Sequence, residues 1–398
     1  MKKATRQQTK EHNRNLILRL LFENASISRA EISRLTRLTR ATVSEIVSEL
    51  IGEGLVAELG PGESMGGKTP TLLGLVEDSR YFIGLDLARN RFSGAIVNLR
   101  GKIMQRIDLP EDSNAEKALA LVFEILDSLI GLSIKPLAGI GVGAPGLVNS
   151  AEGVVVNAVN LDWQNLPLAR LLQERYRLPV AVMNDSQAAA MGEFTYGEGH
   201  TAEDSLVVIN VRYGIGAGII IHGSLFQGDG GGAGEIGHVV VRPEGGLLCR
   251  CGNTGCLETV ASVQAVERRA LQLMRQEGSK YLPSEGQSIG LDDLERAFRE
   301  GDPAVRQAVL ESGQALGAAI SNLVGALNIQ TVVLSGELTR FGEPWLDAIR
   351  QTMTRTALMR LTQNTRLEIG KLGPNGIILG ASAVLLRNYS LLIGSATP

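Results

Sequence analysis

The chain has 398 residues, a length that at about 150 residues per domain predicts two or three domains. Hydrophobic residues make up 44% and charged residues 20%, which excludes a globally disordered chain. No long apolar run occurs, and polar residues follow the N-terminus, so we expect a cytoplasmic protein with neither a membrane span nor a signal peptide. Three cysteines, all within residues 249–256, exclude a disulfide framework and favour metal ligation.

Positive charge is concentrated in the first forty residues. These carry ten Lys or Arg against three Glu, a balance of +7, whereas the rest of the chain has a balance of −10. A basic head on an acidic body indicates that the head meets a polyanion. Charge alone fits a solvated helix face equally well, so the interpretation depends on the pattern inside the head.

Three helices are predicted in the head. The first covers residues 13–22, the second follows an N-cap at Ser28 with Glu31 completing a capping box, and the third follows an N-cap at Thr39 and ends at Gly52 and Gly54. Apolar residues recur at helical spacing in each. Those expected to face the core are Leu16, Ile17, Leu20, Leu21, Ala30, Ile32, Leu35, Val43, Ile46, Val47, Leu50 and Ile51.

A β-hairpin is predicted after the third helix. Residues 55–59 and 71–75 can pair as strands around a glycine-rich loop that carries Lys68. Together with the helices, this wing predicts a winged helix-turn-helix, whose last helix enters the major groove of DNA. The expected DNA contacts are Arg37, Arg40, Thr42, Ser44 and Lys68. A helical hairpin that serves only packing is the alternative; the basic excess, the polar face and the wing together favour DNA binding.

From Tyr81 onward, short β-rich runs alternate with helical segments, which predicts an α/β body of two lobes. The expected strands are residues 81–87, 91–99, 139–142, 180–183, 205–210 and 218–221, and the expected helices are 115–132, 169–176, 260–276 and 304–327. The expected domains are residues 1–78 for the head, 79–195 with 381–398 for the first lobe, and 196–380 for the second lobe.

A compact metal-ligand pattern lies in the second lobe. Cys249, Cys251 and Cys256 form a C-x-C-x4-C loop, and His238 lies eleven residues upstream of it. Three sulfurs and one nitrogen suit tetrahedral zinc with no open position, so we expect a structural Zn²⁺ rather than a hydrolytic one. The alternative is three buried free cysteines and a core histidine, which this spacing disfavours.

The stretch Gly234-Glu235-Ile236-Gly237-His238, followed by residues 249–258, closely resembles the signature of the ROK family of repressors, open reading frames and kinases. Residues 141–146, the pair Asn184-Asp185 and residues 376–383 resemble further family landmarks in the expected order. The resemblance implies a two-lobed, actin-like body of the sugar-kinase kind. With the winged helix-turn-helix in front of it, the chain resembles the repressor branch of the family.

Carboxylates, an imidazole and an Asn-Asp pair are groups that bind a polyol through paired hydrogen bonds. Zinc would occupy one ring nitrogen of His238 and leave the other for a ligand. The resemblance implies that the residues in contact with sugar hydroxyls are Asn184, Asp185, Glu235, His238 and Glu258. It also implies that Asp185 matches the base that activates the hydroxyl in the kinases.

The nucleotide-binding elements depart from those of the family kinases. Where the kinases have an Asp-x-Gly-Gly-Thr hairpin, this chain has Asp86-Leu87-Ala88-Arg89-Asn90, and the bulk of Arg89 would crowd the phosphates. Tyr213 replaces a threonine beside the glycine hairpin, and Glu337 adds negative charge where the nucleotide would lie. We therefore expect no enzyme activity, with Asp185 a vestigial base.

These observations predict a sugar-responsive transcriptional repressor. We expect it to bind operator DNA as a homodimer, since two equivalent readers fit two half-sites, and to respond to a sugar effector that binds between the lobes. Two alternatives stay open: an ATP-dependent sugar kinase with an added DNA-binding head, and a repressor controlled by a protein partner. A metal-sensing repressor is disfavoured because a closed four-ligand site holds zinc permanently.

Overall fold

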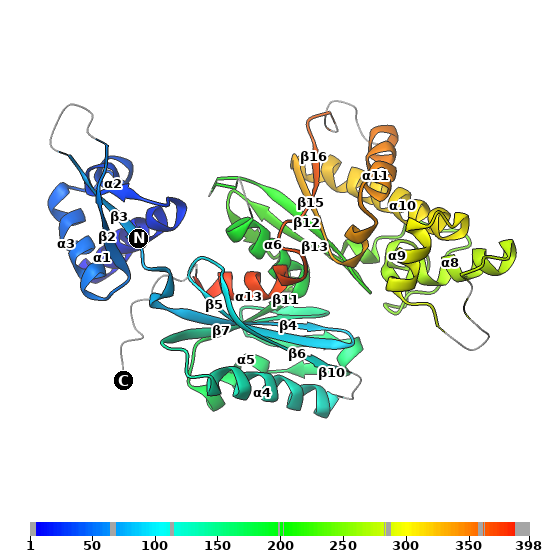
Figure 1. The fold of residues 1–398 in the computed structure, drawn as a ribbon, viewed down its shortest axis with the longest axis horizontal. Coiled ribbons are helices and arrows are strands. Elements are labelled where there is room, and N and C mark those ends of the chain that lie inside the picture. The colour runs from blue at the N-terminus through cyan, green and yellow to red at the C-terminus, as the bar shows by residue number, and fades with distance from the viewer. Residues whose placement is uncertain are drawn as a thin grey trace.

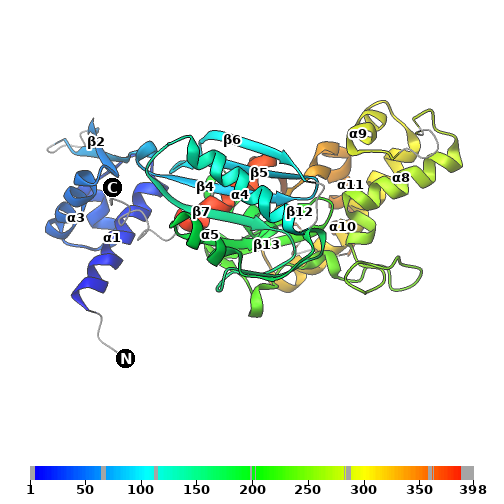
Figure 2. The ribbon, with the colours of Figure 1, turned by 90° about the horizontal axis from the view of Figure 1, so that it is seen from below.

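The structure, a computed structural model, describes residues 5–386 apart from 64–68, 112–114, 198–199, 202, 282, 284–287, 357–360 and 362. It consists of a small winged head and a two-lobed α/β body (Figure 1). The predicted fold class is therefore confirmed. Seen from below, the head lies at one end of the molecule beside the first lobe, and α8 and α9 lie at the other end (Figure 2).

The head contains three helices and one small antiparallel sheet. The helices are α1 (Arg6–Glu23), α2 (Arg29–Thr36) and α3 (Arg40–Gly52), and the sheet has the order β1 (Ile27–Ser28), β3 (Thr71–Leu75), β2 (Val56–Pro61). The Ser28 and Thr39 side chains accept hydrogen bonds from backbone amides three residues on, so both predicted N-caps are confirmed. α1 begins earlier than predicted because Thr5 and Gln8 form a capping box there.

The apolar face of α2 differs from the prediction. Ile32 is buried, but Ala30 is exposed and Leu35 is 49% exposed. The helix has only eight residues, and Ile32 is its single buried side chain. The predicted apolar stripe of α2 is therefore largely exposed. In α1, the predicted Ile17 and Leu21 are fully buried, Leu16 and Leu20 are half-buried, and Leu18, which was not predicted, is fully buried. In α3, the predicted residues are buried apart from Ile51, which is half-buried.

The first lobe is built on a five-stranded sheet with the order β11-β7-β4-β5-β6. Its strands are β4 (Tyr81–Ala88), β5 (Arg91–Asn98), β6 (Ile103–Pro110), β7 (Leu137–Ala144) and β11 (Val180–Asn184). The helices α4 (Ala115–Gly131) and α5 (Leu168–Tyr176) cover its outer face (Figure 1). A small sheet of β8 (Leu147–Asn149), β9 (Val154–Ala158) and β10 (Trp163–Leu166) extends this lobe.

The second lobe is built on a sheet with the order β14-β13-β12-β15-β16. Its strands are β12 (Leu206–Val211), β13 (Ile215–Ile221), β14 (Ser224–Phe226), β15 (Thr331–Ser335) and β16 (Arg366–Ile369). Its helices are α7 (Glu258–Ala261), α8 (Val263–Glu277), α9 (Leu291–Arg299), α10 (Pro303–Leu327) and α11 (Gly342–Thr356). The single helix predicted over 260–276 is wrong in one respect: Ser262 ends α7 and caps α8.

Two helices, α6 (Asp185–Tyr196) and α13 (Gly376–Leu386), lie between the two sheets (Figure 1). α6 packs on the second sheet and α13 on the first, largely through small apolar side chains. The helices meet backbone to backbone, since a Cβ added at Gly380 would lie 1.6 Å from the Ala188 carbonyl oxygen. This helix pair is therefore one layer through which the lobes contact each other. Among the described helices, none is both long and apolar enough to cross a membrane.

Candidate functional site

The start of α3 carries most of the predicted DNA contacts. Arg37, Arg40 and Ser44 are exposed there, and Arg37 adopts a φ of 59° where α2 ends. Thr42 is half-buried, and its hydroxyl lies 2.9 Å from that of the N-cap Thr39, so it takes part in the helix cap. Lys68 lies outside the described residues.

Ion pairs within the head narrow its cationic surface. Described basic side chains that have a carboxylate partner are Lys10 with Glu49, Arg14 with Glu49 and Glu53, Arg19 with Glu23, Arg29 with Glu58, and Arg34 with Glu31. In the part of the chain that the structure describes, Arg37 and Arg40 have no ion-pair partner. Among the described side chains of the head, the positive charge left for a polyanion therefore lies at the turn between α2 and α3, which is the face that a helix-turn-helix presents to DNA.

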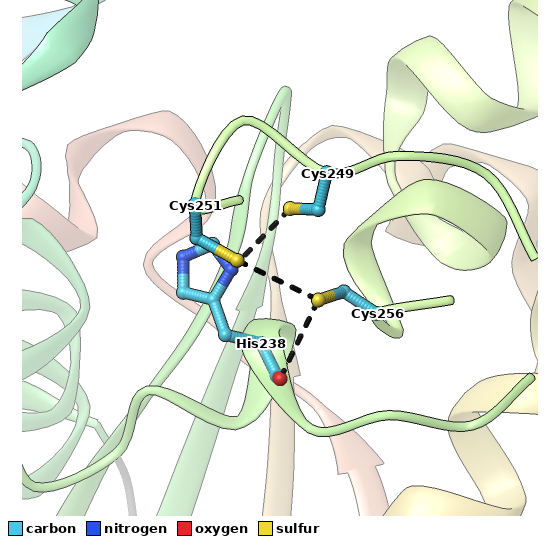
Figure 3. A group of neighbouring side chains, drawn as sticks. All are labelled: His238, Cys249, Cys251 and Cys256. Carbon is cyan, nitrogen blue, oxygen red and sulfur yellow. Dashed lines mark hydrogen bonds between the residues drawn. The ribbon is translucent and has the colours of Figure 1, made fainter. Parts of the chain in front are cut away.

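The predicted metal ligands come together in one cluster (Figure 3). The donor atoms of His238, Cys249, Cys251 and Cys256 all lie within 4.8 Å of one another. Cys251 Sγ lies 3.7 Å from Cys256 Sγ, and Cys249 Sγ lies 3.6 Å from His238 Nδ1. These four residues could hold a metal ion.

The donor spacing and chemistry fit zinc. With Zn–S bonds of about 2.3 Å and Zn–N bonds of about 2.0 Å, a tetrahedral site separates its donors by about 3.6–3.8 Å. Both short separations in the cluster match that value. Burial, together with the neighbouring sulfurs, raises the pKa of Cys256 to about 12, so this thiol needs a bound cation to ionise at neutral pH.

A cavity of about 450 Å³ between the lobes is lined by all five predicted sugar contacts, Asn184, Asp185, Glu235, His238 and Glu258. They come from three elements: the N-terminus of α6, the 3-10 turn Ile236–His238 with the residue before it, and the start of α7. This volume is within the range of small-molecule sites. Sequence-distant groups are thus brought into one ligand-sized space.

Local hydrogen bonds hold these side chains in place. The Asn184 amide oxygen accepts from the Ser186 and Gln187 amides and caps α6, while its Nδ2 donates to the Gly146 carbonyl over 2.9 Å. Glu258 Oε2 accepts from the Ile215 amide over 3.1 Å. Each side chain keeps further hydrogen-bonding capacity for a ligand, since an amide and a carboxylate offer more than these contacts use.

Burial raises the pKa of two carboxyl groups of the cavity, Asp185 and Glu235. Desolvation raises the pKa of Asp185 to about 6, with Asp86 adding to the rise and the Arg212 guanidinium opposing it. Desolvation also raises the pKa of Glu235, against the effect of His238, whose Nε2 lies 3.8 Å from the Glu235 carboxylate. Near neutral pH, Asp185 is an ionised acceptor that a modest fall in pH protonates.

Arg212, which the sequence pattern did not single out, crosses from the second lobe to the first. Its Nη1 donates to both carboxylate oxygens of Asp86, at 3.1 and 3.2 Å, and its Nε donates to Glu337 over 3.2 Å. The sequence feature that could have indicated Arg212 is that this arginine directly follows the apolar run that forms β12. The two carboxylates raise the pKa of this guanidinium against the cost of its burial, so it stays charged.

Arg89 and Tyr213 also meet across the lobes. The Arg89 guanidinium lies over the Tyr213 ring, 5.3 Å from its centroid. A second cavity, of about 300 Å³, is lined by Asp86, Arg212 and Glu337. Arg212 lines both cavities, so charged side chains occupy the region between them.

The fold and the site define a sugar-kinase-like body with a DNA-binding head. Residues 82–388 match the ROK family and residues 11–57 match the winged helix-turn-helix DNA-binding family, and the chain belongs to the ROK family. It is 34% identical over 386 residues to the xylose repressor of Caldicellulosiruptor bescii. This alignment covers 95% of this chain and 96% of the repressor.

Relatives of both functional kinds occur. A glucokinase of Halalkalibacterium halodurans is 34% identical over 327 residues, which is 80% of this chain and 99% of the enzyme. A solved ROK family transcriptional regulator, a homolog of the Escherichia coli MLC protein, superposes with a TM-score of 0.82 at 28% identity and covers 97% of this chain and 98% of its own. The regulators match the head as well as the body.

Proposed function

We propose that this chain is a transcriptional repressor that binds operator DNA through its head and a sugar effector through the cavity between its lobes. The observation that carries the proposal is the union, in one chain, of a winged helix-turn-helix with a cavity lined by five polyol-binding side chains. The xylose repressor, which is similar over nearly the whole length, supports it.

In this proposal, the cavity binds a sugar through paired hydrogen bonds. The Asp185 and Glu258 carboxylates accept from hydroxyls, and the Asn184 amide adds a donor. Zinc, when bound by His238 and the three cysteines, would supply rigidity rather than reactivity. His238 turns Nδ1 toward the sulfurs, so with zinc bound Nε2 would carry the proton and be free to donate to the sugar, with the Glu235 carboxylate 3.8 Å away.

DNA binding is assigned to Arg37, Arg40, Thr42, Ser44 and Lys68, with Arg37 and Arg40 proposed to contact phosphates because, among the described residues of the head, neither has an ion-pair partner. A homodimer would present two heads to two half-sites. The sugar changes DNA affinity only to the extent that it binds the two lobe arrangements with different affinity. The further assignment is that the protein works in the cytoplasm, where operator DNA is found.

We also propose that the chain is not a kinase. Arg212 joins Asp86 to Glu337 in the region where a kinase holds its nucleotide phosphates, and Arg89 stacks on Tyr213 beside it. One observation favours the opposite: Asp185 has a pKa of about 6, which suits a general base, and one relative is a glucokinase. ADP production from ATP with glucose, xylose or N-acetylglucosamine would establish the kinase.

The test of the proposed function is DNA binding. Purified protein is titrated against a fragment from upstream of its own gene at constant salt, with and without glucose, xylose or N-acetylglucosamine, because salt alone changes such affinities by orders of magnitude. We expect tight binding that one sugar shifts by about fivefold or more. DNA binding that ignores every sugar would leave a protein partner as the signal, and no DNA binding would refute the proposal.

A further inference from the structure

The head and the first lobe share one hydrophobic core. Ile17 and Leu21 of α1 pack in the same buried cluster as Phe82 and Leu99 of the first lobe and Leu385 at the end of α13. All five side chains are at most 5% exposed. Because buried apolar contacts are close-packed and not continuously deformable, the head is held on the lobe in a defined orientation rather than tethered by a linker.

Arg100 fastens the C-terminus of α1 to the turn between β5 and β6. Its guanidinium donates to the carbonyl oxygens of Phe22, of Leu21 over 3.1 Å and of Asn24 over 3.2 Å. It also lies 6.0 Å from the centroid of the Phe22 ring. A cation that caps the free carbonyls of a helix end forms charge-assisted bonds and complements the helix dipole.

The turn that carries Arg100 is itself rigid. The Asn98 side chain accepts from the backbone amides of Arg100 and Lys102, and donates to Asp78 over 2.8 Å. Gly101 in this turn has a φ of +82°, and a Cβ added there would lie 2.6 Å from the ring of Tyr196. The Tyr196 ring therefore lies directly against the turn that holds α1.

Tyr196 is the last residue of α6, and the first residue of α6 is Asp185 in the cavity. At 1.5 Å per residue, the twelve residues of α6 span about 18 Å. The helix packs on the second sheet, and the buried Glu193 carboxylate accepts from the Lys371 and Leu372 amides, over 3.2 Å each, in the same lobe. α6 is therefore fastened to the second sheet as well as to α13, whereas its last residue contacts a turn of the first lobe.

We propose that Tyr196, Gly101 and Arg100 form the contact that transmits lobe closure to the DNA-binding head, with Tyr196 and Arg100 as positioning residues. The inference rests on the proposed function and adds the contacts through which sugar binding in the cavity affects the head. When the second lobe moves relative to the first, the α6 end presses on the Gly101 turn, and Arg100 carries the displacement to the end of α1. No residue of this contact lines the cavity or belongs to the predicted DNA contacts.

The experiment uses the full chain and five proteins: wild type, Arg100→Ala, Tyr196→Ala, the conservative Tyr196→Phe, and Lys102→Ala. Lys102→Ala is the matched control, because it removes a cation from the same turn at an exposed side chain. The first readout is the ratio of operator affinities with and without the sugar that shifts wild type, beside the sugar affinity from calorimetry. We expect Arg100→Ala and Tyr196→Ala to bind the sugar within about threefold of wild type. In both variants, the ratio of operator affinities, about fivefold or more in wild type, should fall close to one.

Tyr196→Phe keeps the ring and should behave as wild type, as should Lys102→Ala. A full affinity ratio in both alanine variants would overturn the proposal. The second readout is amide hydrogen exchange of residues 15–24 without sugar, which stays informative if a variant loses DNA binding. Faster exchange of this segment in Tyr196→Ala than in Tyr196→Phe supports the contact, and equal exchange in the two overturns it.

The two proposals fail in distinguishable ways. If wild type binds DNA but no sugar of the panel shifts it, the proposed effector function fails, and the exchange comparison still decides whether Tyr196 holds the head. If a sugar shifts wild type and both alanine variants equally, the effector function stands and the route through Arg100 is wrong.

Discussion

The ion pair between the lobes allows a quantitative prediction. Replacing Arg212 with methionine keeps most of the apolar stem but leaves the Asp86 carboxylate, whose side chain is 6% exposed, without its cation. Removing one partner of a buried pair costs about 3–5 kcal/mol, because an uncompensated charge stays behind. At about 1.6 °C per kcal/mol for a unit of about 300 residues, the Tm of the body should fall by about 5–8 °C.

The assay is thermal unfolding by calorimetry at pH 7.5. Asp86→Asn in the Arg212→Met background removes the stranded charge and should restore part of the loss. The matched control is Arg350→Met, which breaks exposed pairs with Glu343 and Asp347 and should change the free energy of unfolding by less than about 1 kcal/mol. A loss of stability in Arg212→Met as small as that of the control would refute the conclusion that the Arg212–Asp86 pair is buried and stabilising. So would a double variant that recovers no stability.

Three further predictions concern the metal, the cavity and the DNA face. Purified protein should contain about one zinc ion per chain by mass spectrometry. Cys251→Ser should lose both the ion and the sugar response while it still binds DNA. A metal-free variant with a normal sugar response would contradict this. Sugar binding should weaken about tenfold from pH 7.5 to pH 5, because Asp185, with a pKa of about 6, gains a proton and stops accepting from hydroxyls. Calorimetry should find that the sugar affinity of Asp185→Asn depends much less on pH. An equally steep pH dependence in that variant would point to Glu235 instead. Arg40→Ala should weaken binding to all DNA sequences and lower the salt slope by about one, whereas the exposed Arg275→Ala in α8 should not, and identical salt slopes for the two variants would count against the predicted DNA face.

Local signals in the sequence were enough for much of the fold. The N-caps at Ser28 and Thr39, the alternation of strands and helices, and the C-x-C-x4-C loop each depend on residues within about ten positions of one another. Such patterns act through backbone hydrogen bonds and short loops, so neighbouring residues determine them. The five residues predicted to contact a sugar also line one cavity, although their roles were implied by family resemblance rather than by periodicity.

Tertiary structure alone decided how charges pair and how the parts of the molecule touch. Arg212 and Asp86 are 126 residues apart, and nothing in either local pattern indicates the other. The first forty residues have an excess of basic side chains, but folding pairs Lys10 with Glu49, 39 residues away, and leaves Arg37 and Arg40 without an ion-pair partner in the described part of the head.

The contact between Tyr196 and Gly101 belongs to the same class, since it joins the end of a helix in one lobe to a turn in the other. Sequence by itself predicted the three helices of the head, the alternation of strands and helices in the body, and the His-Cys cluster that could hold a metal ion. Only the tertiary structure showed which cations of the described head lack an ion-pair partner and which elements lie between the cavity and the head. The physical reason is that long-range contacts depend on the relative placement of whole elements, which side-chain periodicity does not encode.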